Sequence, residues 1–203
     1  MGAATLDVEA TRHRVLRVAA ALFRARGYAG VSMRAIAQDC GMTAGSLYHH
    51  FSSKEDIVVE VLDRGHVAVH EGVGAALEQT RGRDGARRFR AAVEGHLLAL
   101  HQNTDFASAN VRIFGQVPPD VRARNLGPRL RYEKLWDDFL EELKGSGTLK
   151  PSTDVKMVRL LVLGALNATL EWFDPARGSI EDLAATYGNL LLHGAAGEAP
   201  SSS

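Results

Sequence analysis

The chain has a single cysteine, Cys40, among its 203 residues, so an internal disulfide is excluded. Its longest apolar run, Leu160–Leu166, is far shorter than the roughly 20 residues that span a bilayer. The N-terminus lacks the apolar segment of a secretory signal. These absences predict a protein of the reducing cytoplasm that makes no membrane contact.

Signatures of catalysis are missing as well. The eight histidines show no spacing typical of a metal site, and paired cysteines do not occur. The sequence holds no nucleophile elbow and no P-loop, and Gly72-Val-Gly74 lacks the context of a dinucleotide fingerprint. We therefore predict no catalytic residue, no metal site and no cofactor, which leaves an enzyme as the weakest of the alternatives.

The 24 basic and 24 acidic residues balance overall but are unevenly distributed. Residues 1–54 hold seven Arg or Lys and three Asp or Glu, a net charge of +4, and residues 55–203 carry the compensating −4. A basic head on an acidic body is typical of a protein that binds nucleic acid.

The most informative segment is residues 31–56, VSMRAIAQDCGMTAGSLYHHFSSKED. Ser32 and Thr43 are placed to cap two short helices, and Gly41 lies where the chain must reverse between them. The pattern predicts a helix-turn-helix, in which the second helix enters the major groove of double-stranded DNA.

The first third of the chain resembles the DNA-binding domain of the TetR family of bacterial transcriptional regulators. The residues that carry this resemblance are Ala20–Phe23, Gly27-Tyr28, Val31–Ala37, Gly41, Ser46–Phe51 and Lys54-Glu55. The resemblance implies an all-helical homodimer with a variable C-terminal domain, which binds a small ligand and controls the release of DNA.

The predicted DNA contacts follow from the helix-turn-helix pattern and the resemblance together. They are Ser32, Arg34, Thr43, Ala44, Gly45, Ser46, Tyr48, His49 and Lys54. The resemblance implies phosphate contacts for Tyr48 and Lys54, and base contacts for residues 43–46. Since those four side chains are small, we expect methyl and hydroxyl contacts, Arg34 and DNA shape to provide the readout.

Helical periodicity continues to the end of the chain without a strand pattern, so the predicted fold class is all-α. After the helix-turn-helix, the expected helices cover residues 54–80, 86–101, 106–115, 120–144, 155–173 and 180–193. Gly65, Gly72 and Gly74 are expected sites of bending in the first of these helices, and Gly127-Pro128 is an expected disturbance in the fourth. The predicted domains are a disordered arm at 1–9, a DNA-binding domain at 10–53, a ligand-binding and dimerisation domain at 54–193, and a disordered tail at 194–203.

The expected helix 155–173 is apolar nearly all round at Leu160–Leu166, which is typical of a helix buried on two sides. Paired with the last helix and their copies, it predicts a four-helix homodimer interface. A core helix of a monomer is the alternative. A twofold dimer would read a palindromic operator whose half-sites lie about 34–36 Å apart.

Polar or aromatic side chains within apolar helices are the candidates for an effector pocket. They are His96, His101, Asn110, Arg112, Trp136, Asn167 and Glu171. Asn167 and Glu171 lie four residues apart and share a helix face, although Asn167 alternatively fixes the register of the dimer.

The C-terminal half, at Trp136, residues 171–175 and residues 182–187, is similar to actinobacterial regulators of lipid and steroid catabolism. This likeness implies an acyl-CoA thioester as the candidate effector. Arg122, Arg124, Arg129 and Arg131 would then meet the phosphates of CoA, or they form a solvated helix face.

Together these patterns predict a ligand-responsive regulator, most simply a repressor that a small molecule releases from its operator. A ligand-responsive activator and a helical interaction module without DNA binding are the alternatives. Cys40 is either a small buried side chain or a thiol sensor beside the turn.

Overall fold

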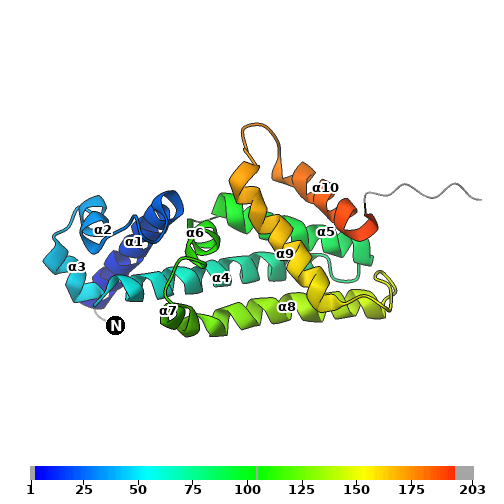
Figure 1. Cartoon of the computed structure of the whole chain (residues 1–203), viewed down its shortest axis with the longest axis horizontal. Helices are drawn as coiled ribbons and strands as arrows, with labels where there is room; N and C mark the ends of the chain where they lie inside the picture. Colours follow the sequence, from blue (N-terminus) through cyan, green and yellow to red (C-terminus); the bar gives the residue numbers. More distant parts are fainter. Residues whose placement is uncertain (1–2, 104, 195–203) are drawn as a thin grey trace, which may run out of the picture. The chain divides into compact units, whose positions relative to one another are not determined.

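The computed structural model describes residues 3–103 and 105–194, and over these residues it contains helices and no strand (Figure 1). The predicted all-α class is confirmed. The elements are α1 (Ala3–Arg26), α2 (Met33–Asp39), α3 (Ala44–His50), α4 (Lys54–Gln79), α5 (Gly85–Leu98), the π-helix η1 (Ala99–Asn103), α6 (Asp105–Ile113), α7 (Pro119–Arg124), α8 (Leu126–Gly145), α9 (Val155–Trp172) and α10 (Ile180–His193).

The chain divides into two compact units. The first comprises Met1–His70 and Ala99–Glu133, and the second comprises Glu71–Leu98 and Lys134–Ser203. The division passes through α4 and α8, so each of these helices contributes its N-terminal part to the first unit and its C-terminal part to the second. The functional boundary expected after residue 53 stays a prediction.

Hydroxyl caps define the short helices of the first unit. Ser32, Thr43 and Ser53 each accept a hydrogen bond from the backbone N–H three residues later, at 3.1–3.2 Å. Between α2 and α3, Gly41 has a φ of +67°, a left-handed conformation that costs glycine little. The predicted helix-turn-helix is therefore confirmed in both its caps and its turn.

The first unit has one continuous apolar core that joins α1 to α2, α3, α4 and α6. Leu47 is fully buried and Phe51 is 2% exposed, as their spacing predicts. Cys40 lies at the edge of this core, where burial raises the pKa of its thiol. A raised pKa suppresses the reactive thiolate, which favours the buried side chain over the thiol sensor.

Helices α4 and α6 approach closely at Gly65. A Cβ added to Gly65 would lie 2.6 Å from both the Cβ of Asn110 and the carbonyl oxygen of Phe106. The Asn110 amide donates a 2.7 Å hydrogen bond to the carbonyl of Leu62 and lies 2.9 Å from Nδ1 of His66. The glycine therefore permits a helix contact, where the sequence suggested a bend, and α4 is one unbroken helix.

Stability at acidic pH is expected to depend on His66. Burial, the largest effect, lowers the pKa of His66 to about 4, below its unfolded value of about 6.5. Because the folded state holds the ring neutral, the stabilisation is complete above pH 6.5 and is lost as the pH falls toward 4. Between pH 7 and pH 5, the free energy of unfolding measured with urea should fall by about 1–2 kcal/mol more for the native chain than for His66→Gln. The exposed His193, replaced by glutamine as the control, should leave the difference unchanged.

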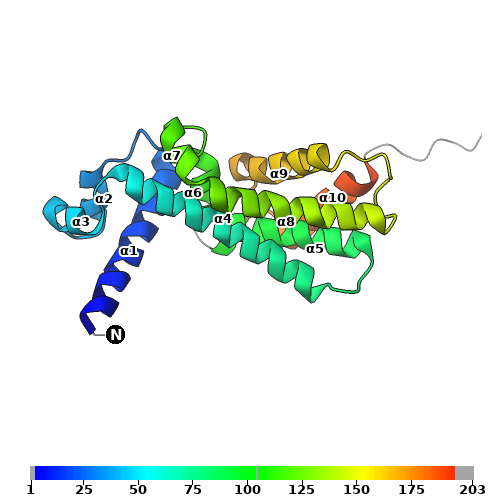
Figure 2. The same cartoon turned by 90° about the horizontal axis from the view of Figure 1, so that it is seen from below.

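Figure 2 shows the helices of the second unit, which are α5, α9, α10 and the C-terminal parts of α4 and α8. The side chains of this unit form an aromatic core of their own. Trp136 of α8 is fully buried and packs edge-on against Phe89 of α5 and Phe139, with ring centroids 6.3–6.4 Å apart. Helix α10 packs on α5 at Gly188, where an added Cβ would lie 2.5 Å from Cγ of Arg90. Close helix contact, again made possible by glycine, holds this unit together.

Three expectations need correction. Helix α1 begins at Ala3, so the described part of the expected arm 1–9 is helical. The disturbance expected at Gly127-Pro128 is a full division of the helix 120–144 at Asn125, because Pro128 fits the first turn of α8, where a missing N–H costs nothing. The end of the expected helix 86–101 is the π-helical η1. Residues 1–2 and the tail 195–203 lie outside the described residues.

Candidate DNA-binding interface

Helix α3 has one buried face and one open face. Leu47 is fully buried, whereas Tyr48 on the other side is 55% exposed. The remaining predicted contacts of this helix and its cap are exposed or half-buried: Thr43, Ala44, Gly45, Ser46 and His49. The open face therefore gathers the side chains that the sequence assigned to DNA.

The start of α3 is shaped for close approach. A Cβ added to Gly45 would meet only the hydroxyl oxygen of Thr43, at 3.9 Å, so the protein leaves this position open. With Ala44 and Gly45 in its first turn, α3 can lie with its N-terminal end deep in a groove about 12 Å wide. Few side-chain atoms would separate the backbone from the base edges.

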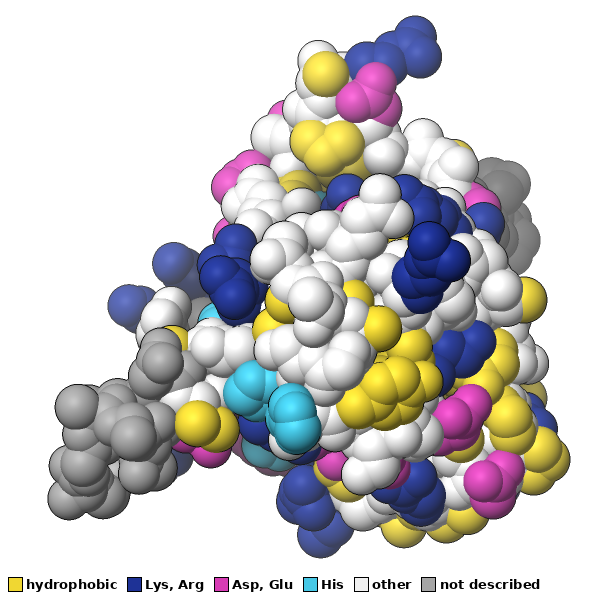
Figure 3. Space-filling view, turned by 90° about the vertical axis from the view of Figure 1, so that its left-hand side faces the viewer, with side chains coloured by type: hydrophobic (Ala, Val, Ile, Leu, Met, Phe, Trp, Pro, Cys, Tyr) yellow, Lys and Arg dark blue, Asp and Glu magenta, His cyan; other side chains and the backbone are white. Residues whose placement is uncertain are grey.

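Helix α2, which packs against α3, adds two further predicted contacts. Ser32 and Arg34, at the start of α2, are exposed. Figure 3 views the side on which α2 and α3 lie in Figure 1, and Lys and Arg side chains are spread across it, with histidines near the centre. Such a distribution suits the phosphate backbone, which supplies most of the affinity for DNA.

Lys54 does not point to the surface. Its ammonium group donates to the backbone carbonyls of Tyr28, at 3.0 Å, and Val31, at 3.1 Å, and lies 3.7 Å from the centre of the Tyr28 ring. The Tyr28 hydroxyl in turn donates to Glu55 at 2.7 Å. Burial lowers the pKa of Lys54, and burial together with the Glu55 contact raises the pKa of Tyr28 to about 12. This cluster fixes the loop that leads into α2.

Lys54→Met is therefore expected to lower the stability of the fold and to leave the contacts with DNA phosphates unchanged. Two half-buried carbonyls would lose their donor, at a cost of about 1–3 kcal/mol measured by urea unfolding. The salt dependence of DNA affinity should stay unchanged. Tyr48→Phe serves as the comparison, because its exposed hydroxyl contributes nothing to the core: stability should hold while DNA affinity falls. If Lys54→Met keeps native stability but the DNA affinity of this variant depends less steeply on salt, Lys54 contacts a DNA phosphate.

Arg12 is a structural residue that the sequence analysis missed. Its guanidinium donates to the carbonyl of His50, forms an ion pair with Glu60 and lies 4.0 Å from the centre of the Phe51 ring. It therefore ties α1 to the end of α3 and to α4. Long-range pairing of this kind leaves no local signal in the sequence.

The predicted effector residues fall in both units. In the second unit, His96 and Asn167 come together, with Nε2 of His96 3.1 Å from Oδ1 of Asn167. Trp136 is part of the aromatic core, and Glu171 is exposed. His101, Asn110 and Arg112 belong to the first unit.

Within the first unit, these residues have different surroundings. Asn110 is 7% exposed and is used to join α6 to α4. His101 lines a surface cleft against α1. The arginines proposed for CoA phosphates are partly engaged elsewhere, since Arg124 pairs with Asp56 at 2.8 Å and Arg129 with Glu133 at 2.7 Å.

Two absences hold for the residues that the structure describes. No group of three or more His, Cys, Asp or Glu side chains there is placed to hold a metal ion. No described helix combines the length and the apolar character needed to cross a membrane.

A capped α2, a glycine turn and an open-faced α3 define a helix-turn-helix DNA-binding protein. Comparison with known proteins gives the family. Residues 15–61 match the bacterial regulatory proteins of the TetR family, and residues 82–195 match the tetracyclin repressor-like C-terminal domain. The chain belongs to the TetR family, and it is accordingly a transcriptional regulator and not an enzyme.

Individual relatives match over nearly the whole chain. The regulator UidR of Escherichia coli K12 is 38% identical over 203 residues, covering 91% of this chain and 95% of its own. The repressor KstR2 of Mycolicibacterium smegmatis is 29% identical over 193 residues, covering 90% and 89%. The crystal structure of AibR with isovaleryl coenzyme A and operator DNA has a TM-score of 0.79 at 23% identity, covering 90% and 98%, which is a likeness of fold.

Proposed function

We propose that this protein is a homodimeric repressor that a small molecule, an acyl-CoA thioester, releases from a palindromic operator. The observation that carries the DNA-binding part is the open face of α3, on which small exposed side chains lie opposite the buried Leu47. Since operators lie in the cytoplasm of bacteria, we infer that the protein acts there.

The dimer is proposed to form through α9 and α10. Helix α9 buries one face in its own unit, yet Leu160 is 50% exposed and Leu161 is 61% exposed. Met157, Gly164, Ala168 and Trp172 continue this open stripe at helical spacing. A Cβ at Gly164 would meet nothing within 4 Å, so a second helix can approach closely there. Exposed apolar stripes of this kind mark interfaces.

The base readout is proposed to depend on shape as much as on hydrogen bonds. Thr43 and Ser46 offer hydroxyls and Ala44 offers a methyl group, but their side chains cannot form the bidentate contacts that discriminate bases most strongly. Arg34, exposed at the start of α2, is the one predicted contact with a bidentate group. We therefore expect operator positions outside the direct contacts to matter through DNA deformability.

The proposed effector class has two kinds of support. AibR, which is similar in fold, has been crystallised with isovaleryl coenzyme A. Within this chain, the paired His96 and Asn167 are polar side chains in the largely apolar interior of the second unit. Convergent polar groups in apolar surroundings are the usual means of orienting a ligand.

The test is fluorescence anisotropy on the duplex upstream of the protein's own gene, titrated with salt and with a panel of acyl-CoA thioesters. We expect tight, salt-sensitive binding that one thioester reverses. Binding that no thioester disturbs would discard the effector class and keep the regulator. No preference over a random duplex would contradict the proposal for this operator, and a ligand that strengthens binding would favour an activator.

Asn167→Leu is expected to reduce the response to the effector. Its amide faces His96 within one protomer, so removing it should raise the thioester concentration for half-release by at least about tenfold and leave DNA affinity within about twofold. The same anisotropy titration measures both quantities. Lys156→Gln, at an exposed position near the start of the same helix and outside the effector candidates, is the control. A monomeric Asn167→Leu protein would instead assign the residue to the dimer interface.

A further inference from the structure

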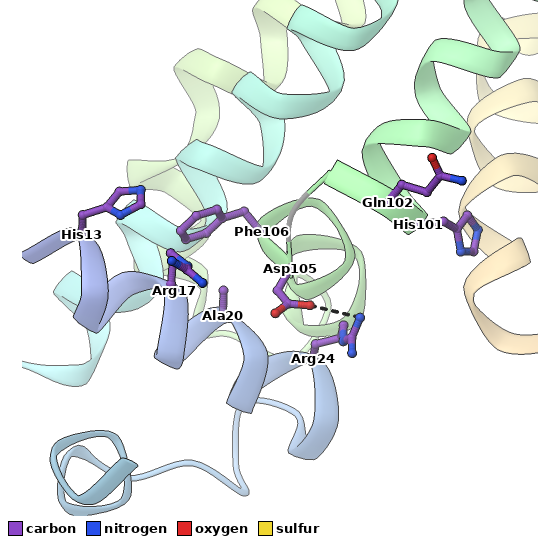
Figure 4. Close-up of a pocket in the computed structure, with 8 residues that line it drawn as sticks. All are labelled: His13, Arg17, Ala20, Arg24, His101, Gln102, Asp105 and Phe106. Atoms are coloured by element: carbon purple, nitrogen blue, oxygen red, sulfur yellow. Dashed lines mark ion pairs between the residues drawn. The ribbon is translucent and has the colours of Figure 1, made fainter. Parts of the chain in front are cut away.

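A cleft of about 460 Å³ lies between α1 on one side and residues of η1 and α6 on the other (Figure 4). One face of α1, at spacings of four, three and four residues, forms the first wall. The opposite wall comes from the π-helical turn and the first residues of α6. The lining residues are His13, Arg17, Ala20, Arg24, His101, Gln102, Asp105 and Phe106. All of them belong to the first unit.

The polar groups of the cleft are mostly hydrogen-bond donors. Arg17 and Gln102 reach it from opposite walls, and both side chains are exposed. The one carboxylate, Asp105, is neutralised by Arg24 at 3.0 Å, which is the dashed contact in Figure 4. Arg17 therefore leaves the cleft with a net positive charge. Burial lowers the pKa of His101, so this ring adds a neutral polar group.

The floor of the cleft is apolar. Phe106 is 6% exposed, so only one edge of its ring reaches the opening, whereas Ala20 is fully buried within the lining. A volume of 460 Å³ falls within the range of sites that hold a small organic molecule. A hydrated inorganic ion would leave most of that space unfilled. The dimensions and the apolar floor thus favour an organic ligand that carries an anionic group.

We propose that this cleft binds a small organic anion, with a carboxylate or phosphate group held by Arg17 and its apolar part against Ala20 and Phe106. Arginine suits both groups because its planar fork donates two parallel hydrogen bonds. Gln102 on the opposite wall supplies a further donor. The π-helical turn that carries His101 and Gln102 is a distortion that occurs frequently at functional sites.

Occupancy of the cleft would regulate the DNA-binding head. The ligand touches α1, whose Arg12 is tied to α3, and simultaneously touches η1 and α6. The distance between α1 and the opposite wall can differ between conformations of the DNA-binding domain. A ligand that binds one of these conformations more tightly than another shifts the equilibrium toward it, by an amount set by the difference in affinity. This regulatory role rests on the function proposed above, whereas binding of the anion does not.

The test is calorimetric titration of the full-length protein, without DNA, using adenosine 5′-phosphate and benzoate as probes of the two anionic groups. We expect at least one probe to bind with a Kd below about 1 mM, and Arg17→Gln to weaken it by at least about tenfold. Arg24→Gln should weaken it as well, because it exposes the Asp105 carboxylate to the anion. Arg14→Gln, an exposed arginine of α1 outside the cleft, should change the Kd by less than about twofold.

Three results would overturn the inference. In the first, neither probe binds the native protein. In the second, Arg14→Gln weakens probe binding as much as Arg17→Gln does. In the third, Arg17→Gln leaves probe binding intact but lowers the salt slope of DNA binding by about one, which assigns Arg17 to a DNA phosphate. Anisotropy on the operator is measured in parallel. Loss of operator binding by the native protein would refute the proposed function and leave the anion site standing.

Discussion

Replacing Gly45 with leucine should abolish operator binding and leave the fold intact. The added side chain meets only the Thr43 hydroxyl oxygen, at 3.9 Å from the Cβ, so the protein has room for it. Replacing a helical glycine should even stabilise α3, by about 0.5–1 kcal/mol. In the complex, however, that side chain would stand between the first turn of α3 and the base edges. We expect a loss of at least about 100-fold in affinity, equivalent to about 2.7 kcal/mol.

Gly74→Leu is the matched control for Gly45→Leu. A Cβ at Gly74 meets nothing within 4 Å, and this glycine likewise lies within a helix, but it belongs to the second unit. Operator affinity of this variant should match the native protein in the same anisotropy assay. If Gly45→Leu binds normally and folds normally, α3 does not enter the groove by its first turn, and the proposed interface is wrong.

The double variant Leu160→Glu and Leu161→Glu should separate the dimer into folded monomers. Both side chains are at least half exposed within one protomer, so the change costs the protomer less than about 0.5 kcal/mol. In the proposed interface, four buried carboxylates per dimer would face apolar surface without partners. Sedimentation velocity should give the mass of one chain. Operator affinity should fall by at least about 100-fold, because one head no longer holds the other on its half-site.

Leu130→Glu controls for the added charge. Leu130 is 57% exposed on α8, in the first unit and outside the proposed interface. This variant should stay dimeric and bind the operator normally. If Leu130→Glu dissociates the protein and the α9 variant does not, the dimer forms through the surface around Leu130 instead of α9.

Short-range features of this fold could be predicted from the sequence. The caps Ser32, Thr43 and Ser53 and the turn at Gly41 depend on residues only three or four positions away, so their signals are local. The same applies to Leu47, whose burial follows from helical spacing. For this reason the helix-turn-helix and its open face were predictable almost residue by residue.

Long-range partners could not be predicted in the same way. Lys54 and Arg12 both look like surface cations in the sequence, yet each binds a backbone carbonyl more than twenty positions away. The cleft beside α1 is equally non-local, since its walls are about 80 residues apart along the chain. Gly65 was expected to bend α4, and only the position of Asn110 shows that it permits a helix contact instead.

The contact at Gly65 has a mechanical consequence. The Cβ of Asn110 and the carbonyl of Phe106 occupy the space that a side chain at position 65 would fill. Helix α6 therefore cannot slide along α4 unless the two helices first separate. Two helices in such close contact are expected to move together as one rigid body. Movement of α6 is therefore expected to carry the first turns of α4 with it, and only three residues separate the end of α3 from the start of α4.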